Sequence, residues 1–135
     1  MNIYSRIEPT EILHIINRVK DIQPGRVDLV EDNQFIQCAS IRHPNGTTFK
    51  PHRHIVYPRA HMYITQESWV VIKGLVQVIL YDLDNTILHT DVLEPGDVSI
   101  TLRGGHNYLF MAEDSIVYEY KTGPYFGQQN DKIFI

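Results

Sequence analysis

The stretch GTTFKPHRHIVYPRAHMYITQESWVVIKG, residues 46–74, carries the strongest signals in this chain. His52 and His54 are separated by one residue, so in a β-strand both imidazoles lie on the same face. Two imidazoles on one face are a pair of potential ligands for a transition metal. Glu67 opens a β-type run and can add a carboxylate, and His106, in the later segment LRGGHNYLF, can add a third imidazole. These residue types predict an open metal site built from strands.

The spacing of these residues resembles the first motif of the cupins, a family of small β-barrels with a metal in the mouth of the barrel. Gly46 is followed by five residues and then by His52 and His54. Six residues separate Glu67 from Gly74, as in the second half of that motif. Twelve residues lie between His54 and Glu67, which is longer than the family spacer.

The second cupin motif combines a Pro-Gly-Asp turn with a later histidine, and residues 95–97 and His106 match it. Phe110 stands where the family often has asparagine. The resemblance implies an all-β fold, a cupin barrel (double-stranded β-helix, or jelly roll), with one divalent transition metal. The implied ligands are His52, His54, Glu67 and His106. This donor set suits Zn, Fe, Ni or Mn and does not choose among them.

The long spacer contains four side chains that can contact a ligand: Tyr57, Arg59, His61 and Tyr63. Loops next to a site often determine specificity, and His61 is an alternative metal ligand. The other interpretation is a surface connection between two strands.

Composition narrows the possible partners. The chain has 135 residues, 43% of them hydrophobic, which predicts one globular domain. A net charge of -4 without a basic stripe argues against nucleic acid as a partner. Cys38 is the only cysteine, the N-terminus has no signal-peptide pattern, and no apolar run is long enough to span a bilayer. We therefore expect a cytoplasmic protein with no membrane partner.

The N-terminal segment from Glu11 to Lys20 has the spacing of an amphipathic helix. Its apolar side chains at 12, 15, 16 and 19 fall on one helical face, and Pro24-Gly25 ends the pattern. We expect one short N-terminal α-helix packed outside the barrel, with His14 on its solvated side. Residues 1–33 would then be this helix and a lead-in strand, and residues 34–135 the cupin barrel of a single domain.

From Arg26 onward the chain has short β-type runs broken by turn residues, which is typical of a sandwich or barrel. Two of these runs, 68–72 and 75–81, are expected to form a hairpin across Gly74. The expected strands are residues 34–42, 47–54, 68–72, 75–81, 87–93, 98–102, 107–111 and 115–121.

The C-terminal segment YEYKTGPYFGQQNDK holds the second group of candidate site residues. In a strand, Glu119 and Lys121 share a face with Val117, and Tyr125 follows the next turn. The segment resembles the tail of WbuC-type cupin metalloproteins, which are associated with bacterial O-antigen and surface-polysaccharide gene clusters. That resemblance favours an inward orientation of Glu119 and Lys121, beside the metal and with Trp69 nearby.

Two classes of function fit these residues. The first is a metal-dependent enzyme that acts on a small hydroxylated substrate such as a sugar, as an isomerase or epimerase, or as an iron-dependent oxygenase. Its catalytic residues would be Glu119, Lys121 and Tyr125. The second is a non-catalytic module that binds a sugar or a metal. We also expect a homodimer, because an exposed sheet edge favours pairing with another chain.

Overall fold

The computed structural model describes residues 1–31, 33–42, 44, 47, 64–113, 115–122 and 133–135. This part of the chain is all β, with antiparallel pairing throughout and no α-helix. Within it, no helix has the length and apolar character needed to cross a membrane. The strands are β1 (Asn2–Tyr4), β2 (Ile12–Asn17), β3 (Gly25–Asp28), β4 (Ala39–Arg42), β5 (Glu67–Lys73), β6 (Val76–Tyr81), β7 (Ile87–Leu93), β8 (Val98–Thr101), β9 (Gly105–Phe110) and β10 (Ile116–Lys121). A 3-10 turn, η1 (Val19–Asp21), follows β2.

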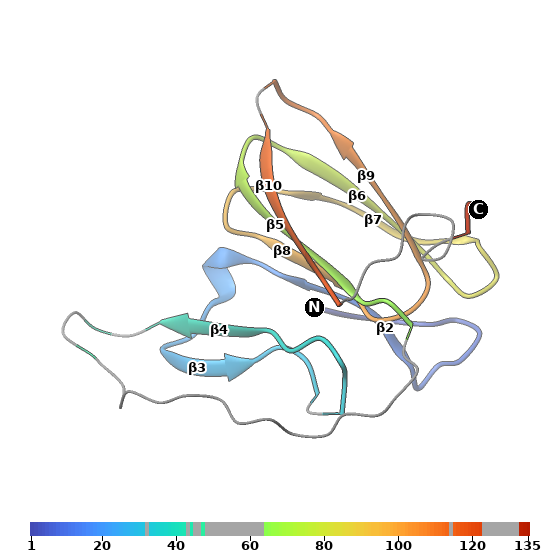
Figure 1. The fold of residues 1–135 in the computed structure, drawn as a ribbon, viewed down its shortest axis with the longest axis horizontal. Coiled ribbons are helices and arrows are strands. Elements are labelled where there is room, and N and C mark those ends of the chain that lie inside the picture. Colours follow the sequence, from blue (N-terminus) through green and yellow to red (C-terminus); the bar gives the residue numbers. More distant parts are fainter. Residues whose placement is uncertain (32, 43, 45–46, 48–63, 114, 123–132) are drawn as a thin grey trace.

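The described strands form three sheets (Figure 1). The largest has five strands in the order β1-β2-β8-β5-β10, the second has the order β7-β6-β9, and β3 pairs with β4 in the third. From β5 to β10 the chain alternates between the two larger sheets, except at the β6–β7 hairpin. Among the described residues these sheets remain open and do not close into a barrel.

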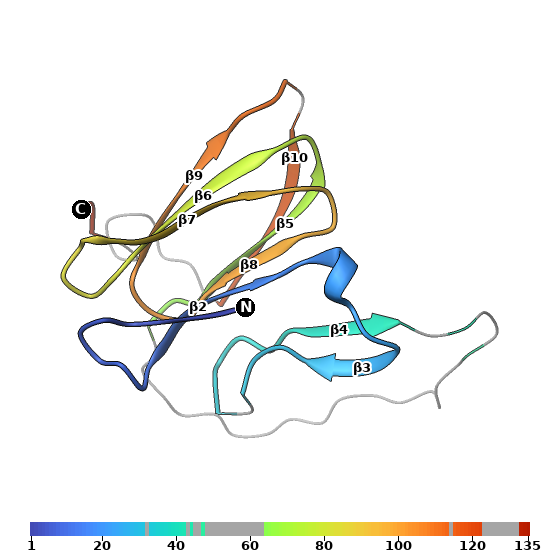
Figure 2. The ribbon, with the colours of Figure 1, turned by 180° about the vertical axis from the view of Figure 1, so that it is seen from behind.

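The main core lies between the two larger sheets. It joins side chains of β1, β2 and β5 to side chains of β6 and β7, and its buried members are Ile3, Ile16, Val71, Val76, Val78, Leu80 and Leu93. A second core covers the opposite face of the five-stranded sheet, where the chain around β3 and β4 packs (Figure 2). Its buried members are Ile15, Val30, Val98, Ile100 and Leu102. The five-stranded sheet is therefore covered on both faces at β2 and β8.

The expected N-terminal helix is wrong. Residues Ile12–Asn17 form the strand β2, which pairs with β1 and β8 inside the five-stranded sheet. Four consecutive residues, 13–16, are buried because each face of β2 contacts one of the two cores. A strand covered on both faces is a continuous apolar run, which hydrophobic spacing alone does not distinguish from a buried helix. His14, expected on a solvated face, has none of its surface exposed.

The expected hairpin across Gly74 is also wrong. β5 pairs with β8 and β10, whereas β6 pairs with β7 and β9, so the turn at Gly74 carries the chain from one sheet to the other. The remaining strand predictions after residue 67 are confirmed to within about two residues, which is the usual uncertainty of element ends. β4 begins later than expected, at Ala39, and most of the expected strand 47–54 lies outside the described residues.

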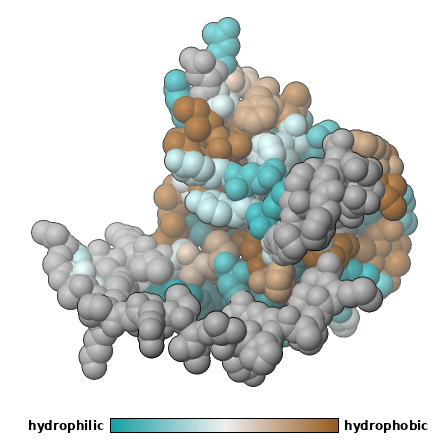
Figure 3. All heavy atoms as spheres, in the orientation of Figure 1, coloured by the Kyte–Doolittle hydropathy of each residue, from teal (hydrophilic) through white to brown (hydrophobic). Residues whose placement is uncertain are grey.

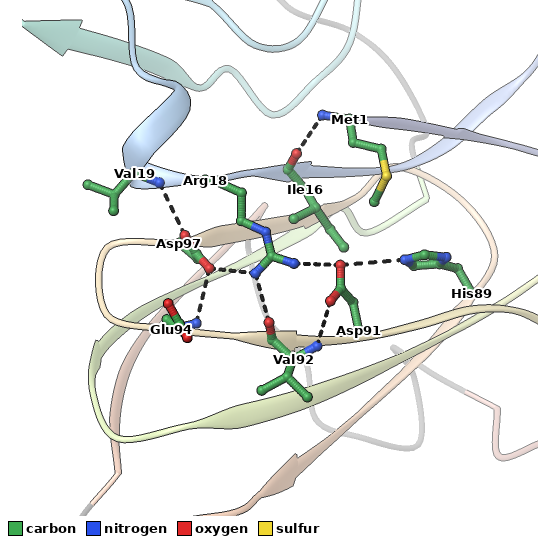
Figure 4. Close-up of polar contacts among 9 residues, drawn as sticks. All are labelled: Met1, Ile16, Arg18, Val19, His89, Asp91, Val92, Glu94 and Asp97. Carbon is green, nitrogen blue, oxygen red and sulfur yellow. Dashed lines mark hydrogen bonds and ion pairs between the residues drawn. The ribbon is translucent and has the colours of Figure 1, made fainter.

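Arg18 joins the end of β2 to the turn before β8 (Figure 4). Its guanidinium donates to Asp97 Oδ2 and to Asp91 Oδ2, each at 2.6 Å, and to the carbonyl of Val92 at 2.7 Å. Asp97 also accepts the backbone N–H groups of Val19 at 3.1 Å and Glu94 at 3.0 Å. The Pro95-Gly96-Asp97 turn therefore connects β7 to β8 and also anchors the end of β2.

Candidate metal centre

Glu67 and His106 meet in the interior between the two larger sheets. Glu67 begins β5 in the five-stranded sheet, and His106 lies in β9 of the three-stranded sheet. The distance from His106 Nε2 to Glu67 Oε1 is 3.1 Å, although the two residues are far apart in sequence. Glu67 has only 7% of its surface exposed, so its carboxylate points into the protein.

The donor pair fits a metal by its chemistry and by its separation. Two adjacent ligands of an octahedral ion at 2.0–2.2 Å are about 3 Å apart, which is close to the observed distance. The same distance also allows a direct hydrogen bond from the imidazole to the carboxylate. His106 Nδ1 is buried and has no hydrogen-bond partner among the described atoms.

The other two proposed ligands, His52 and His54, lie outside the described residues, as do His61 and the loop around Arg59. Within the described ranges, no group of three or more His, Cys, Asp or Glu side chains is arranged to hold a metal. The described part of the site thus contributes two donors, Glu67 and His106, and their role as ligands stays a prediction.

Aromatic side chains surround the donor pair. Trp69 donates its indole N–H to Glu67 Oε1 at 2.8 Å and stacks on Tyr108, with ring centroids 4.0 Å apart and planes 6° from parallel. The Tyr108 hydroxyl lies 3.3 Å from Ser99 Oγ. Burial raises the pKa of Tyr108, and the nearby negative charges of Glu67 and Glu119 add to that effect, so the phenol stays protonated.

His14 is a polar group near the site that sequence reasoning missed. Its Nε2 lies 3.1 Å from the carbonyl of Tyr81, and its Nδ1 lies 3.2 Å from Thr101 Oγ1. Because a carbonyl only accepts, Nε2 carries the proton and Nδ1 accepts from the hydroxyl. Burial lowers the pKa of His14 to about 4, despite the opposing hydrogen bond to Tyr81, and His106 contributes to the lowering. The sequence gives no local signal for the burial of His14, because the apolar run around it fits a helix as well as a strand covered on both faces.

Glu119 and Lys121 lie on the same face of the sheet as Glu67. In the register of β10 with β5, Lys121 is opposite Glu67 and Glu119 is opposite Trp69. Val117, on the same face of β10, packs against the core between the sheets. The side chains of Glu119 and Lys121 are 43% and 22% exposed, with Lys121 Nζ 3.9 Å from Glu119 Oε1. The third predicted catalytic residue, Tyr125, lies outside the described residues.

Two cavities found among the described residues lie away from this centre. One, of about 430 Å³, opens between the N-terminal hairpin and the segment after β3, over Ile12, Ile15 and Val30. The other, of about 300 Å³, borders Arg18 and Asp97. Neither is lined by Glu67 or His106.

A comparison of this chain with protein-family models, with curated proteins and with solved structures finds no match.

Proposed function

We propose that this protein is a cupin-like metalloprotein, similar to the WbuC type, that binds one divalent transition metal through His52, His54, Glu67 and His106. The observation that carries the proposal is the approach of Glu67 and His106 within 3.1 Å from different sheets. In the cupin motifs these two positions are ligands, and they come from separate motifs of the sequence. The alternation of the chain between two antiparallel sheets supports the double-stranded β-helix as the complete fold.

The proposed substrate is a small hydroxylated molecule, such as a sugar or a sugar derivative. A bound ion in such a site would act as a Lewis acid toward a carbonyl and hydroxyl pair. Glu119 is the candidate general base, with its Oε1 as the proton acceptor and Lys121 as its electrostatic partner. Diagonal neighbours on paired strands have Cα atoms about 7–8 Å apart, which brings the Glu119 side chain within reach of a ligand beside Glu67. Tyr125 is the third candidate.

The proposed reaction class is isomerisation or epimerisation, with proton transfer at Glu119. The alternative enzymatic reaction is an iron-dependent oxygenation at the same centre. A non-catalytic sugar- or metal-binding module is the alternative of a different class. We also propose that the protein acts in the cytoplasm on a free small molecule.

Elemental analysis of the purified protein tests the metal proposal. We expect about one divalent metal per chain, and Glu67→Gln and His106→Ala should lose most of it while remaining folded. His89→Ala is the matched control, because His89 lies beside Asp91 and outside the proposed ligand set. Full metal content in His106→Ala would contradict the assignment. Metal should also dissociate as the pH falls, since histidine ligands must be deprotonated.

The catalytic proposal has its own test, a screen of sugar phosphates and nucleotide sugars with the metal-loaded protein. Glu119→Gln keeps the shape of the side chain and removes its charge, so it should abolish turnover of any substrate found and retain the metal. Unchanged turnover in Glu119→Gln would exclude Glu119 as the base. The absence of turnover across the screen, together with tight binding of one compound, would favour the binding module.

A further inference from the structure

The indole of Trp69 contacts a carboxylate oxygen of Glu67, one of the four proposed metal ligands. Its Nε1–H donates to Glu67 Oε1 at 2.8 Å, and the same oxygen faces His106 Nε2 at 3.1 Å. Trp69 and Glu67 are two residues apart in β5, so both side chains leave the strand on the same face. The carboxylate oxygen therefore lies between an indole N–H and an imidazole.

The direction of that N–H group is determined by packing between the two sheets. Tyr108, from β9, stacks on the indole at a centroid distance of 4.0 Å, and Phe110, from the same strand, lies at 5.9 Å with a tilted ring. The Tyr108 hydroxyl in turn meets Ser99 of β8 at 3.3 Å. Residues from both layers thus hold the indole plane.

We propose that Trp69 is a positioning residue for the Glu67 carboxylate, and that Tyr108 keeps Trp69 in place. This inference rests on the proposed function, because it concerns Glu67 as a metal ligand. An indole N–H can only donate and an ionised carboxylate can only accept, so the contact has one possible polarity. It fixes which oxygen of Glu67 turns toward His106. Hydrogen bonds of this kind orient carboxylate ligands and typically change metal affinity by about 10–100-fold.

The same geometry restricts a second possible role of Trp69, as a platform for a sugar ring, to one face of the indole. The indole face toward Tyr108 is covered by a nearly parallel ring. Stacking on a sugar needs a free aromatic face. Only the opposite face of Trp69 remains for stacking on a ring, whereas its N–H group is already engaged by Glu67.

Titration calorimetry with Zn²⁺ and with Ni²⁺, on chelator-stripped full-length protein, tests the proposal. Trp69→Phe keeps an aromatic ring next to Tyr108 but removes the donor. We expect an unchanged stoichiometry and an affinity about 10–100-fold lower than that of the wild type. Tyr118→Phe is the matched control: it removes a hydroxyl from an exposed tyrosine of β10 that has no part in the contact, so its affinity should stay close to that of the wild type. Equal affinity of Trp69→Phe and the wild type would overturn the positioning role.

A metal-free measurement separates the failure of this inference from that of the proposed function. Trp69 is the only tryptophan in the chain, so the protein has a single indole N–H resonance in its NMR spectrum. In stripped protein, Glu67→Ala should move that resonance, because the acceptor is removed. An unmoved resonance overturns the contact even if the wild type binds metal. If the resonance moves but the wild type binds neither metal, the metal proposal is wrong and the role of Trp69 as a ligand-positioning residue falls with it.

Discussion

His14 is held as a neutral imidazole inside the sheet. It has no exposed surface, and both ring nitrogens have partners: the Tyr81 carbonyl at 3.1 Å and Thr101 Oγ1 at 3.2 Å. Protonation of Nδ1 would place two donors against each other, because the Thr101 hydroxyl already donates to it. Burial is the largest cause of the lowered pKa, about 4 compared with an ordinary value of 6.5. A single side chain therefore makes the stability of the fold depend on pH.

We predict that acidification destabilises the protein through His14. Between pH 6.5 and about 4 the unfolded chain binds a proton at this residue that the folded chain does not. Stability is thus complete above pH 6.5 and is lost as the pH falls toward 4, by up to about 3 kcal/mol for this group alone. Urea unfolding at about pH 7 and about pH 5 measures the loss. His14→Gln, which does not titrate, should show a smaller decrease between the two conditions, and an identical decrease would contradict the prediction.

At the scale of elements, the Arg18 network connects β2 and η1 to the turn before β8 (Figure 4). The carboxylate of Asp97 is 4% exposed and accepts from one guanidinium and two backbone N–H groups. Asp91, which also binds Arg18, is 27% exposed. Hydrogen bonds from Arg18 and Val92 keep the pKa of Asp91 below its ordinary value, although burial opposes them. We expect the buried carboxylate to have the larger structural role, because solvent screens it less than Asp91.

We predict that Asp97→Ala destabilises the protein by about 2–4 kcal/mol, because it removes a buried carboxylate that accepts from the Arg18 guanidinium and from two partly buried backbone N–H groups. Asp91→Ala should cost only about 1 kcal/mol, since solvent screens the more exposed pair. Chemical unfolding of both variants at neutral pH measures the difference. Equal losses of stability in the two variants would show that Asp97 does not anchor the end of β2.

At the scale of the whole molecule, the proposed centre would join two layers that otherwise meet mainly through apolar packing. Glu67 belongs to the five-stranded sheet and His106 to the three-stranded sheet. A metal held by both would bind the folded chain and not the unfolded one. We predict a stabilisation of about 2.7 kcal/mol when free Zn²⁺ is roughly 100 times the Kd. Thermal unfolding with and without the metal measures it; Glu67→Gln should lose the gain, and an equal gain in that variant would place the metal elsewhere.

The outer surface of the same layers is apolar near β10. Figure 3 shows hydrophobic atoms gathered in the upper part of the molecule, where Figure 1 draws β5, β9 and β10. The exposed large side chains of β5 and β10, which pair with each other, are Ile72, Ile116, Tyr118 and Tyr120. Exposed apolar surface beside a sheet edge favours association with another chain.

We predict that the protein is a homodimer in solution. Light scattering at micromolar concentration should give twice the mass of one 15.7 kDa chain. Tyr118→Lys on the exposed face of β10 should weaken the association, whereas Lys20→Glu, on η1, should not. A monomeric wild-type protein would contradict the prediction.

The sequence by itself determined the all-β class and the strands after residue 67. Those signals are local, because residues such as Asp82–Asn85 and Pro95-Gly96 favour turns by their own conformational preferences. Asn85, for example, adopts a positive φ of 67° in the β6–β7 hairpin. Cupin spacing also singled out Glu67 and His106 together, and the two side chains lie 3.1 Å apart. Their function as ligands, with His52 and His54, stays a prediction.

Only the tertiary structure decided the state of residues 12–17, the sheets to which β5 and β6 belong, and the contact between Trp69 and Glu67. The spacing of the isoleucines satisfies a helix as well as a strand covered on both faces, and local propensity does not distinguish the two. The choice depends on β1 (residues 2–4) and β8 (residues 98–101), which pair with β2 on either side, and on the cores that cover each face. Such coverage comes from residues distant in the chain, so it is decided when the sheets pack and not by any local stretch of sequence.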